Sequence, residues 1–175
     1  MSKLIIKHAS SVDMEVDAIV NAANKYLASG SGVCGEIFKR AGYIELNNAC
    51  RSIKTPLEDG SAVITPSFNI NTCKYIIHAV GPDFNINPDA FDSLYLAYYN
   101  SLLLIKDNNL RSVSFPLISA GIYGGGIDNI DVLSCKELIK AYETFNKTFN
   151  YDITVYLCAY SEKEYNDIKK YDILN

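Results

Sequence analysis

Short runs of apolar, often β-branched residues recur along the chain, and polar or turn-forming residues bound each of them. Such runs are typical of β-strands. They lie at residues 4–6, 18–20, 62–65, 75–80, 112–116 and 153–157. The run at residues 75–80 is almost continuously apolar, as expected for a strand that helices cover on both faces.

Between these runs, apolar residues repeat every three or four positions, which predicts helices. The expected helices lie at residues 37–41, 47–51, 91–105 and 132–149. Gly42 stands where the first should end, and Asp89 is expected to cap the third. Ser161 and Glu164 predict a capping box that opens a further helix. Strands alternating with helices indicate an α/β fold with a largely parallel sheet, and residues 1–175 are expected to form a single domain.

Two glycine-rich segments, residues 30–35 and residues 121–126, each follow a predicted strand. In open α/β sheets, loops at the carboxyl ends of neighbouring strands face each other across a ligand-binding crevice. Glycines and helix N-termini expose backbone N–H groups, so two facing loops of this kind suit a diphosphate. No G-x-G-x-x-G motif follows the first predicted strand, since the one with this spacing, at residues 30–35, follows the second. The chain also has no G-x-x-x-x-G-K-[ST] motif, so the usual dinucleotide and nucleoside-triphosphate sites are disfavoured.

Composition narrows the class of protein. The net charge of −4 and the pI near 5.1 disfavour a nucleic-acid partner on electrostatic grounds. The five cysteines are odd in number and form no C-x-x-C pair, so the sequence predicts neither a disulfide framework nor a metal site. No run approaches the roughly 20 apolar residues of a membrane span, and no signal-peptide pattern is visible. We therefore expect a cytoplasmic protein with no membrane association.

Four motifs occur in order along the chain. They are Asn-Ala-Ala-Asn at residues 21–24, Gly-Ser-Gly-Val at 30–33, His-Ala-Val-Gly-Pro at 78–82 and Pro-Leu-Ile-Ser-Ala-Gly-Ile-Tyr-Gly at 116–124. Together they resemble the macro domain family over essentially the full length. The motif variants look closest to macro domains of positive-strand RNA viruses, of alphavirus and coronavirus type, and to MacroD-like members. The resemblance implies a three-layer α/β/α sandwich with a mixed, largely parallel central sheet, a cleft for ADP-ribose and, for a viral protein, the host cytoplasm.

The resemblance also implies which residues contact ADP-ribose. They are Ser10, Ser11, Asn21, Asn24, Gly30, Ser31, Gly32, Val33, Cys34, Ser119, Ala120, Gly121, Ile122, Tyr123 and Tyr160. Backbone N–H groups of residues 32–34 would bind one phosphate, and residues 119–123 would wrap the other. The Asn24 amide, with donor and acceptor atoms, would bind the distal ribose hydroxyls. Tyr123 would cover that ribose and Tyr160 would lie against adenine.

One position departs from the family pattern. Many members carry an acidic residue in the loop before the second strand, where it accepts a hydrogen bond from the adenine amino group. Counting back from Asn21 places Ser10 there, and Asp13 would reach this place only with a shifted loop. The loss of one charge-assisted hydrogen bond would cost on the order of 1.5–3 kcal/mol, or less if Ser10 or a water substitutes.

Three classes of function remain open at this point: an enzyme, a reader and an RNA-binding module. The resemblance implies hydrolysis of aspartyl- or glutamyl-linked mono-ADP-ribose from modified proteins, with Asn24, Gly32 and Tyr123 as the catalytic residues and with no cofactor or metal. Removal of the acetyl group from O-acetyl-ADP-ribose would use the same cleft. The alternatives are a reader, a module that binds ADP-ribose without catalysis, and an RNA-binding module. The expected partners are ADP-ribose and mono-ADP-ribosylated proteins, and the expected state is a monomer.

Structural roles compete with functional ones at several of these residues. Asn21 can pin the adjacent loops instead of touching a ligand. His78 lies within an apolar strand and is expected to be a hydrogen-bonded core histidine. Cys34 is expected to be a small residue at a helix start, without an activated thiolate. Because neither His8 nor His78 falls in a glycine loop, a conventional general base is hard to find, and catalysis would rest on position and electrostatics.

Overall fold

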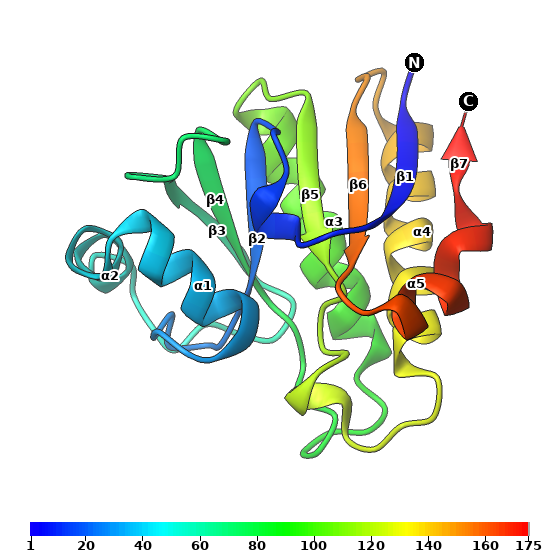
Figure 1. The fold of residues 1–175 in the computed structure, drawn as a ribbon, viewed down its shortest axis with the longest axis horizontal. Helices are drawn as coiled ribbons and strands as arrows, with labels where there is room; N and C mark the ends of the chain where they lie inside the picture. The colour runs from blue at the N-terminus through cyan, green and yellow to red at the C-terminus, as the bar shows by residue number, and fades with distance from the viewer. Residues whose placement is uncertain (175) are drawn as a thin grey trace.

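A computed structural model describes residues 1–174 as a seven-stranded sheet between two layers of helices (Figure 1). The strands are β1 (Lys3–His8), β2 (Ala18–Ala23), β3 (Ala62–Pro66), β4 (Tyr75–Val80), β5 (Ser112–Pro116), β6 (Thr154–Ala159) and β7 (Ile173–Leu174). Their order across the sheet is β3-β4-β2-β5-β6-β1-β7. The five inner strands are parallel, whereas β3 and β7 pair antiparallel at the two edges. The mixed, largely parallel sheet expected from the resemblance is confirmed.

Helices cover both faces of this sheet. They are α1 (Gly32–Ala41), α2 (Tyr43–Arg51), α3 (Phe91–Asp107), α4 (Ile130–Thr148) and α5 (Glu162–Ile168), with short 3-10 helices η1 (Ser11–Asp13), η2 (Ile122–Gly124) and η3 (Lys169–Tyr171). Side chains of α1 and α2 form one buried core with one face of the sheet, and side chains of α3, α4 and α5 form a second core with the opposite face. Within residues 1–174, no helix has both the length and the apolar character needed to cross a bilayer.

Strand β4 shows how the alternation of side chains serves the two cores. Ile77 and Ala79 belong to the core under α3 and α4, whereas Ile76 and Val80 belong to the core under α1 and α2. Because successive strand residues point to opposite faces, His78 lies on the α1 side of the sheet, where it is fully buried. The strand is apolar throughout because both of its faces are covered.

Three predicted helix starts can be compared with the structure: one prediction is confirmed and two are wrong. The capping box is confirmed, because the Glu164 N–H donates to Ser161 Oγ at 3.1 Å and the Ser161 N–H donates to Glu164 Oε1 at 3.1 Å. Asp89 does not cap α3: the helix begins at Phe91, so Ala90 takes the N-cap position and Asp89 lies one residue too early. Helix α2 begins at Tyr43 instead of residue 47, since its first two residues are exposed and contribute no buried apolar repeat.

Candidate functional site

A cleft of about 890 Å³ opens where the parallel strands β1, β2, β5 and β6 end. Its walls come from the four loops that follow these strands and from the first turns of α1 and α5 (Figure 1). Every predicted contact residue except Asn21 lines it: Ser10, Ser11, Asn24, Gly30, Ser31, Gly32, Val33, Cys34, Ser119, Ala120, Gly121, Ile122, Tyr123 and Tyr160. Ligands of open α/β sheets bind at such carboxyl ends.

The first wall is the N-terminus of α1. Gly32 begins the helix with a φ of +60°, a conformation that favours glycine, and Ser31 at the N-cap makes no capping hydrogen bond through its side chain. The backbone N–H groups of the first turn therefore stay available for an anion. A Cβ atom at Gly35 would lie 2.5 Å from the Gly30 carbonyl oxygen, so the loop crosses the helix closely only because residue 35 has no side chain.

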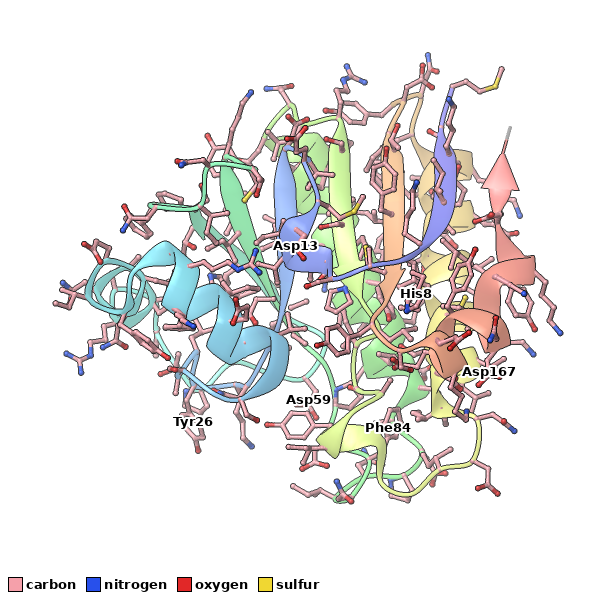
Figure 2. The ribbon with its side chains drawn as sticks, viewed as in Figure 1. His8, Asp13, Tyr26, Asp59, Phe84 and Asp167 are labelled. Atoms are coloured by element: carbon pink, nitrogen blue, oxygen red, sulfur yellow. The ribbon has the colours of Figure 1, made fainter. Side chains whose placement is uncertain are left out.

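The second wall is the loop after β5, and its carbonyl groups are already engaged. The Phe84 N–H donates to the Tyr123 carbonyl at 2.9 Å, and Asn85 Nδ2 donates to the Ile122 carbonyl at 2.8 Å. Figure 2 shows Phe84 beside this loop at the lower edge of the molecule. The N–H groups of residues 121–123 have no protein acceptor among residues 1–174. They provide a second set of free donors.

Residues after β4 support this second wall from behind. Ser119 has a φ of +61°, and its hydroxyl donates to the Pro82 carbonyl at 2.7 Å. A Cβ atom at Gly81 would lie 2.4 Å from Cγ2 of Ile118 and 2.5 Å from Oγ of Ser119. The Gly81-Pro82 part of the third motif therefore packs behind the loop after β5 and stabilises its conformation.

Asn24 lines the cleft, but its amide is largely occupied. Oδ1 accepts hydrogen bonds from the N–H groups of Tyr26 and Ala28, both at 3.1 Å, and Nδ2 donates to the Ala28 carbonyl at 2.9 Å. A carboxamide oxygen has two acceptor lone pairs and the nitrogen has two hydrogens. One N–H therefore remains for a ligand, whereas the expectation of both a donor and an acceptor for the ribose does not fit this geometry.

Asn21 does not line the cleft, in contrast to the ligand contact that the resemblance implied. Asn21 is only 1% exposed, and its Nδ2 atom lies 3.1 Å from Nδ1 of His78 and 3.7 Å from Sγ of Cys34. His78 also contacts Thr65, with Nε2 at 2.9 Å from Oγ1. The geometry therefore agrees with the structural interpretation of Asn21 and with a hydrogen-bonded core histidine at residue 78.

None of the cysteine thiols near the cleft is activated. Burial raises the pKa of the Cys34 thiol above its usual value, and it raises the pKa of Cys158 to about 12. Burial lowers the pKa of His78 to about 4, which keeps this imidazole neutral. Among residues 1–174, no cluster of three or more His, Cys, Asp or Glu side chains is placed to hold a metal ion. The cleft therefore offers hydrogen-bond donors and shape in place of a thiolate nucleophile.

Sequence reasoning missed Glu36 and Arg40 as lining residues of the cleft. Asp13, which was expected at the adenine position only with a shifted loop, and Glu164, which was named only for the capping box, also line it. Among the described lining residues Arg40 alone is basic, and its guanidinium pairs with Asp13 at 2.5 Å and with Glu36 at 2.8 Å. A signal was present, since Gly32, Glu36 and Arg40 follow one another at four-residue intervals on one side of α1. With its one cation neutralised, the cleft would hold phosphates mainly through backbone N–H groups.

Residues 20–130 match the model of the Macro domain family. The chain belongs to the macro domain family. The mouse ADP-ribose glycohydrolase MACROD2 is 49% identical over 113 residues, which cover 63% of this chain and 23% of that protein. The chain thus matches only about a quarter of that relative's length.

Solved structures of the family share this fold. The Oceanobacillus iheyensis macrodomain with ADP is 31% identical, with a TM-score of 0.87 over 97% of this chain and 89% of the other. The Trypanosoma brucei macrodomain in complex with ADP-ribose is 28% identical, with a TM-score of 0.77 over 95% and 68%. Bacterial, archaeal and mammalian proteins are among the relatives of this macro domain, and they give no support to the viral subfamily.

Proposed function

We propose that this macro domain binds ADP-ribose in the cleft and hydrolyses aspartyl- or glutamyl-linked mono-ADP-ribose from modified proteins. One observation carries the proposal: unpaired backbone N–H groups of the α1 first turn and of residues 121–123 line the same cleft. Two donor sets of this kind match the two phosphates of a diphosphate. The relatives support it, because one is named an ADP-ribose glycohydrolase and related structures contain ADP or ADP-ribose.

In this proposal the protein acts mainly by holding the distal ribose and a water in place. A Cβ atom at Gly32 would meet no protein atom within 4 Å, so a phosphate or a water can approach the backbone there. Asn24 would use its remaining N–H on a distal ribose hydroxyl, and Tyr123 would cover that ribose. Water would then attack the anomeric carbon through an oxocarbenium-like transition state while the bond from that carbon to the carboxylate oxygen of the modified Asp or Glu breaks. The carboxylate leaves as an anion, the water loses one proton to solvent, and position and fixed dipoles supply most of the rate enhancement. Deacetylation of O-acetyl-ADP-ribose would use the same cleft.

A reader without catalysis is the second candidate. It is favoured by the Asn24 amide, whose contacts within residues 24–28 leave it only one free donor. A reader needs only the backbone N–H groups that bind the phosphates and the residues that contact the adenine. Hydrolysis also needs a water held near the anomeric carbon. RNA binding is less well supported, since Arg40, the only basic side chain among the described residues that line the cleft, is paired with two carboxylates.

The test combines a binding measurement with a turnover measurement. Calorimetry with ADP-ribose should show one site per chain. Incubation with an auto-modified protein that carries labelled mono-ADP-ribose should then release this label. Tight binding with fully retained label would identify a reader and remove the enzyme proposal. Absence of ADP-ribose binding would overturn both.

A further inference from the structure

A row of buried polar side chains crosses the sheet beneath the first glycine loop. Thr65 on β3, His78 on β4 and Asn21 on β2 lie on neighbouring strands, and Asn21 is the register partner of His78. All three are 5% exposed or less. The row continues to Cys34 on α1, which is 6% exposed. The protein thus places a continuous polar chain inside an otherwise apolar core.

The donors and acceptors of this chain have one consistent direction. Asn21 Nδ2 has two hydrogens, and its two neighbours are Nδ1 of His78 at 3.1 Å and Sγ of Cys34 at 3.7 Å. His78 Nδ1 is then an acceptor, so the proton of the neutral ring is on Nε2 and points to Thr65 Oγ1. Rotating the amide by 180° would strand two buried hydrogens, whereas the present orientation strands only Oδ1.

This row of buried hydrogen bonds ends at the Ala28 carbonyl, which also accepts a hydrogen bond from Asn24. The Cys34 thiol donates to the Ala28 carbonyl at 3.6 Å, and Asn24 Nδ2 donates to the same carbonyl at 2.9 Å. With Asn21 as donor to its sulfur, the Cys34 S–H is free to point at Ala28. One carbonyl oxygen therefore joins the buried chain to the residue that would bind the distal ribose.

We propose that Asn21 and Cys34 are positioning residues for Asn24. The inference rests on the proposed function of the cleft, since it concerns how that function's ribose-binding amide is oriented. The buried hydrogen bonds fix the Cys34 sulfur, the sulfur fixes the Ala28 carbonyl, and the carbonyl fixes which Asn24 N–H faces the ligand. Buried polar networks in a low-dielectric interior are rigid when their donors are satisfied, which suits this role.

A double-mutant cycle tests this coupling. Cys34→Ala removes the thiol as acceptor and donor but keeps the backbone N–H at the helix start. We expect it to weaken ADP-ribose binding about fivefold, with a similar fall in label release. In the Asn24→Ala background the same substitution should have no further effect, because the residue through which Cys34 acts is gone. Asn21→Leu, which keeps the branched shape of the side chain but removes both N–H donors, should behave like Cys34→Ala.

Cys50→Ala is the matched control, since Cys50 is also a buried thiol in the core under α1 and α2. It should lower stability as Cys34→Ala does and leave the ADP-ribose affinity unchanged. The proposal is overturned if Cys34→Ala binds like the wild type, or if it weakens binding by the same factor with and without Asn24. Wild-type protein that does not bind ADP-ribose overturns the proposed function, and this proposal with it.

A second measurement needs no ligand. In ¹⁵N NMR spectra of the free protein, the side-chain amide resonances of Asn24 should shift in Cys34→Ala and stay in place in Cys50→Ala. His78 should show an unprotonated Nδ1 and a protonated Nε2 at neutral pH. Unshifted Asn24 resonances in Cys34→Ala would contradict the coupling even for a variant that folds normally.

Discussion

The guanidinium of Arg40 on α1 donates to the carboxylate of Asp13 on η1 at 2.5 Å, joining two walls of the cleft. Nε of Arg40 also donates to Glu36 at 2.8 Å. Two carboxylates therefore surround the only basic side chain among the described lining residues. Coulombic attraction between this cleft and a diphosphate is accordingly small, and hydrogen bonds from the backbone must supply the recognition.

This pairing predicts weak salt dependence of ADP-ribose binding. Between 50 and 300 mM NaCl we expect the Kd to change by less than about threefold, because few free cationic side chains are available to be screened. Calorimetric titrations at several salt concentrations measure this directly. A single-stranded RNA serves as comparison, since binding through phosphates falls steeply with salt. Tight, steeply salt-dependent RNA binding would reduce ADP-ribose to an accessory ligand.

Asn24→Ala tests the proposed ribose contact. We expect label release to fall on the order of 100-fold, because the ribose loses the donor that orients it. The fold should be retained, since the Asn24 amide bonds only within residues 24–28 and its surroundings are partly exposed. Asn48→Ala, at an exposed position of α2, is the control for a lost amide. Unchanged turnover in Asn24→Ala would remove the assigned role.

Ser10→Asp tests where the base lies. Ser10 lines the cleft, and the resemblance to the family matches it with a position that is acidic in many members. A carboxylate there should accept from the adenine amino group and strengthen ADP-ribose binding by up to about tenfold, the lower part of the range for a charge-assisted hydrogen bond. Ser10→Ala is the matched control and should change affinity little. Equal or weaker affinity in Ser10→Asp would indicate a different base pocket.

His78 predicts a specific pH dependence of stability. Its pKa is about 4 in the folded protein, below the ordinary value of 6.5, because burial disfavours the charged ring. The unfolded chain therefore binds the proton first as pH falls, and stability should decrease between about pH 6.5 and 4 by about 3 kcal/mol. Urea unfolding at pH 4.5, 6 and 7.5 should show that the free energy of unfolding decreases less with falling pH in His78→Gln than in the wild type. Parallel curves would contradict the assignment of a neutral, buried ring.

Gly35→Ala tests the close crossing of the first loop. The added Cβ would lie 2.5 Å from the Gly30 carbonyl oxygen, so the loop must move, at a cost of about 1–3 kcal/mol. We expect a lower Tm and weaker ADP-ribose binding. Gly124→Ala is the control for stability, because Gly124 lies in the 3-10 helix η2 and a Cβ there would come no closer than 3.4 Å to its neighbours. A Gly35→Ala protein as stable as Gly124→Ala would show that the crossing is not tight.

Local sequence patterns predicted the elements whose surroundings are simple. Strand β4 was predicted with its observed bounds because both of its faces are apolar, and the start of α5 followed from a capping box that is itself local. The two-residue strand β7 was missed, since so short a segment is a strand only through its pairing with β1.

The site shows the same division between local and long-range information. Positions of the two glycine loops follow from motifs, and all but one of the predicted contacts line the cleft. The Arg40–Asp13 pair joins residues 27 positions apart, and the Asn21–His78 contact joins residues 57 positions apart. No local pattern contains such a pairing, because it exists only once the sheet and α1 are assembled. The occupied state of the Asn24 amide likewise depends on the path of residues 24–28.

Packing of residues 122–125 against Phe84 and Asn85 has a consequence for the kinetics of recognition. Gly125 lies so close to Phe84 that a Cβ atom would be 2.7 Å from its backbone, and two carbonyls of the loop are held by residues 84 and 85. The conformational entropy of this segment is thus lost when the chain folds, before any nucleotide arrives. We expect association to be limited by diffusion and desolvation, with no slow isomerisation of the phosphate-binding wall.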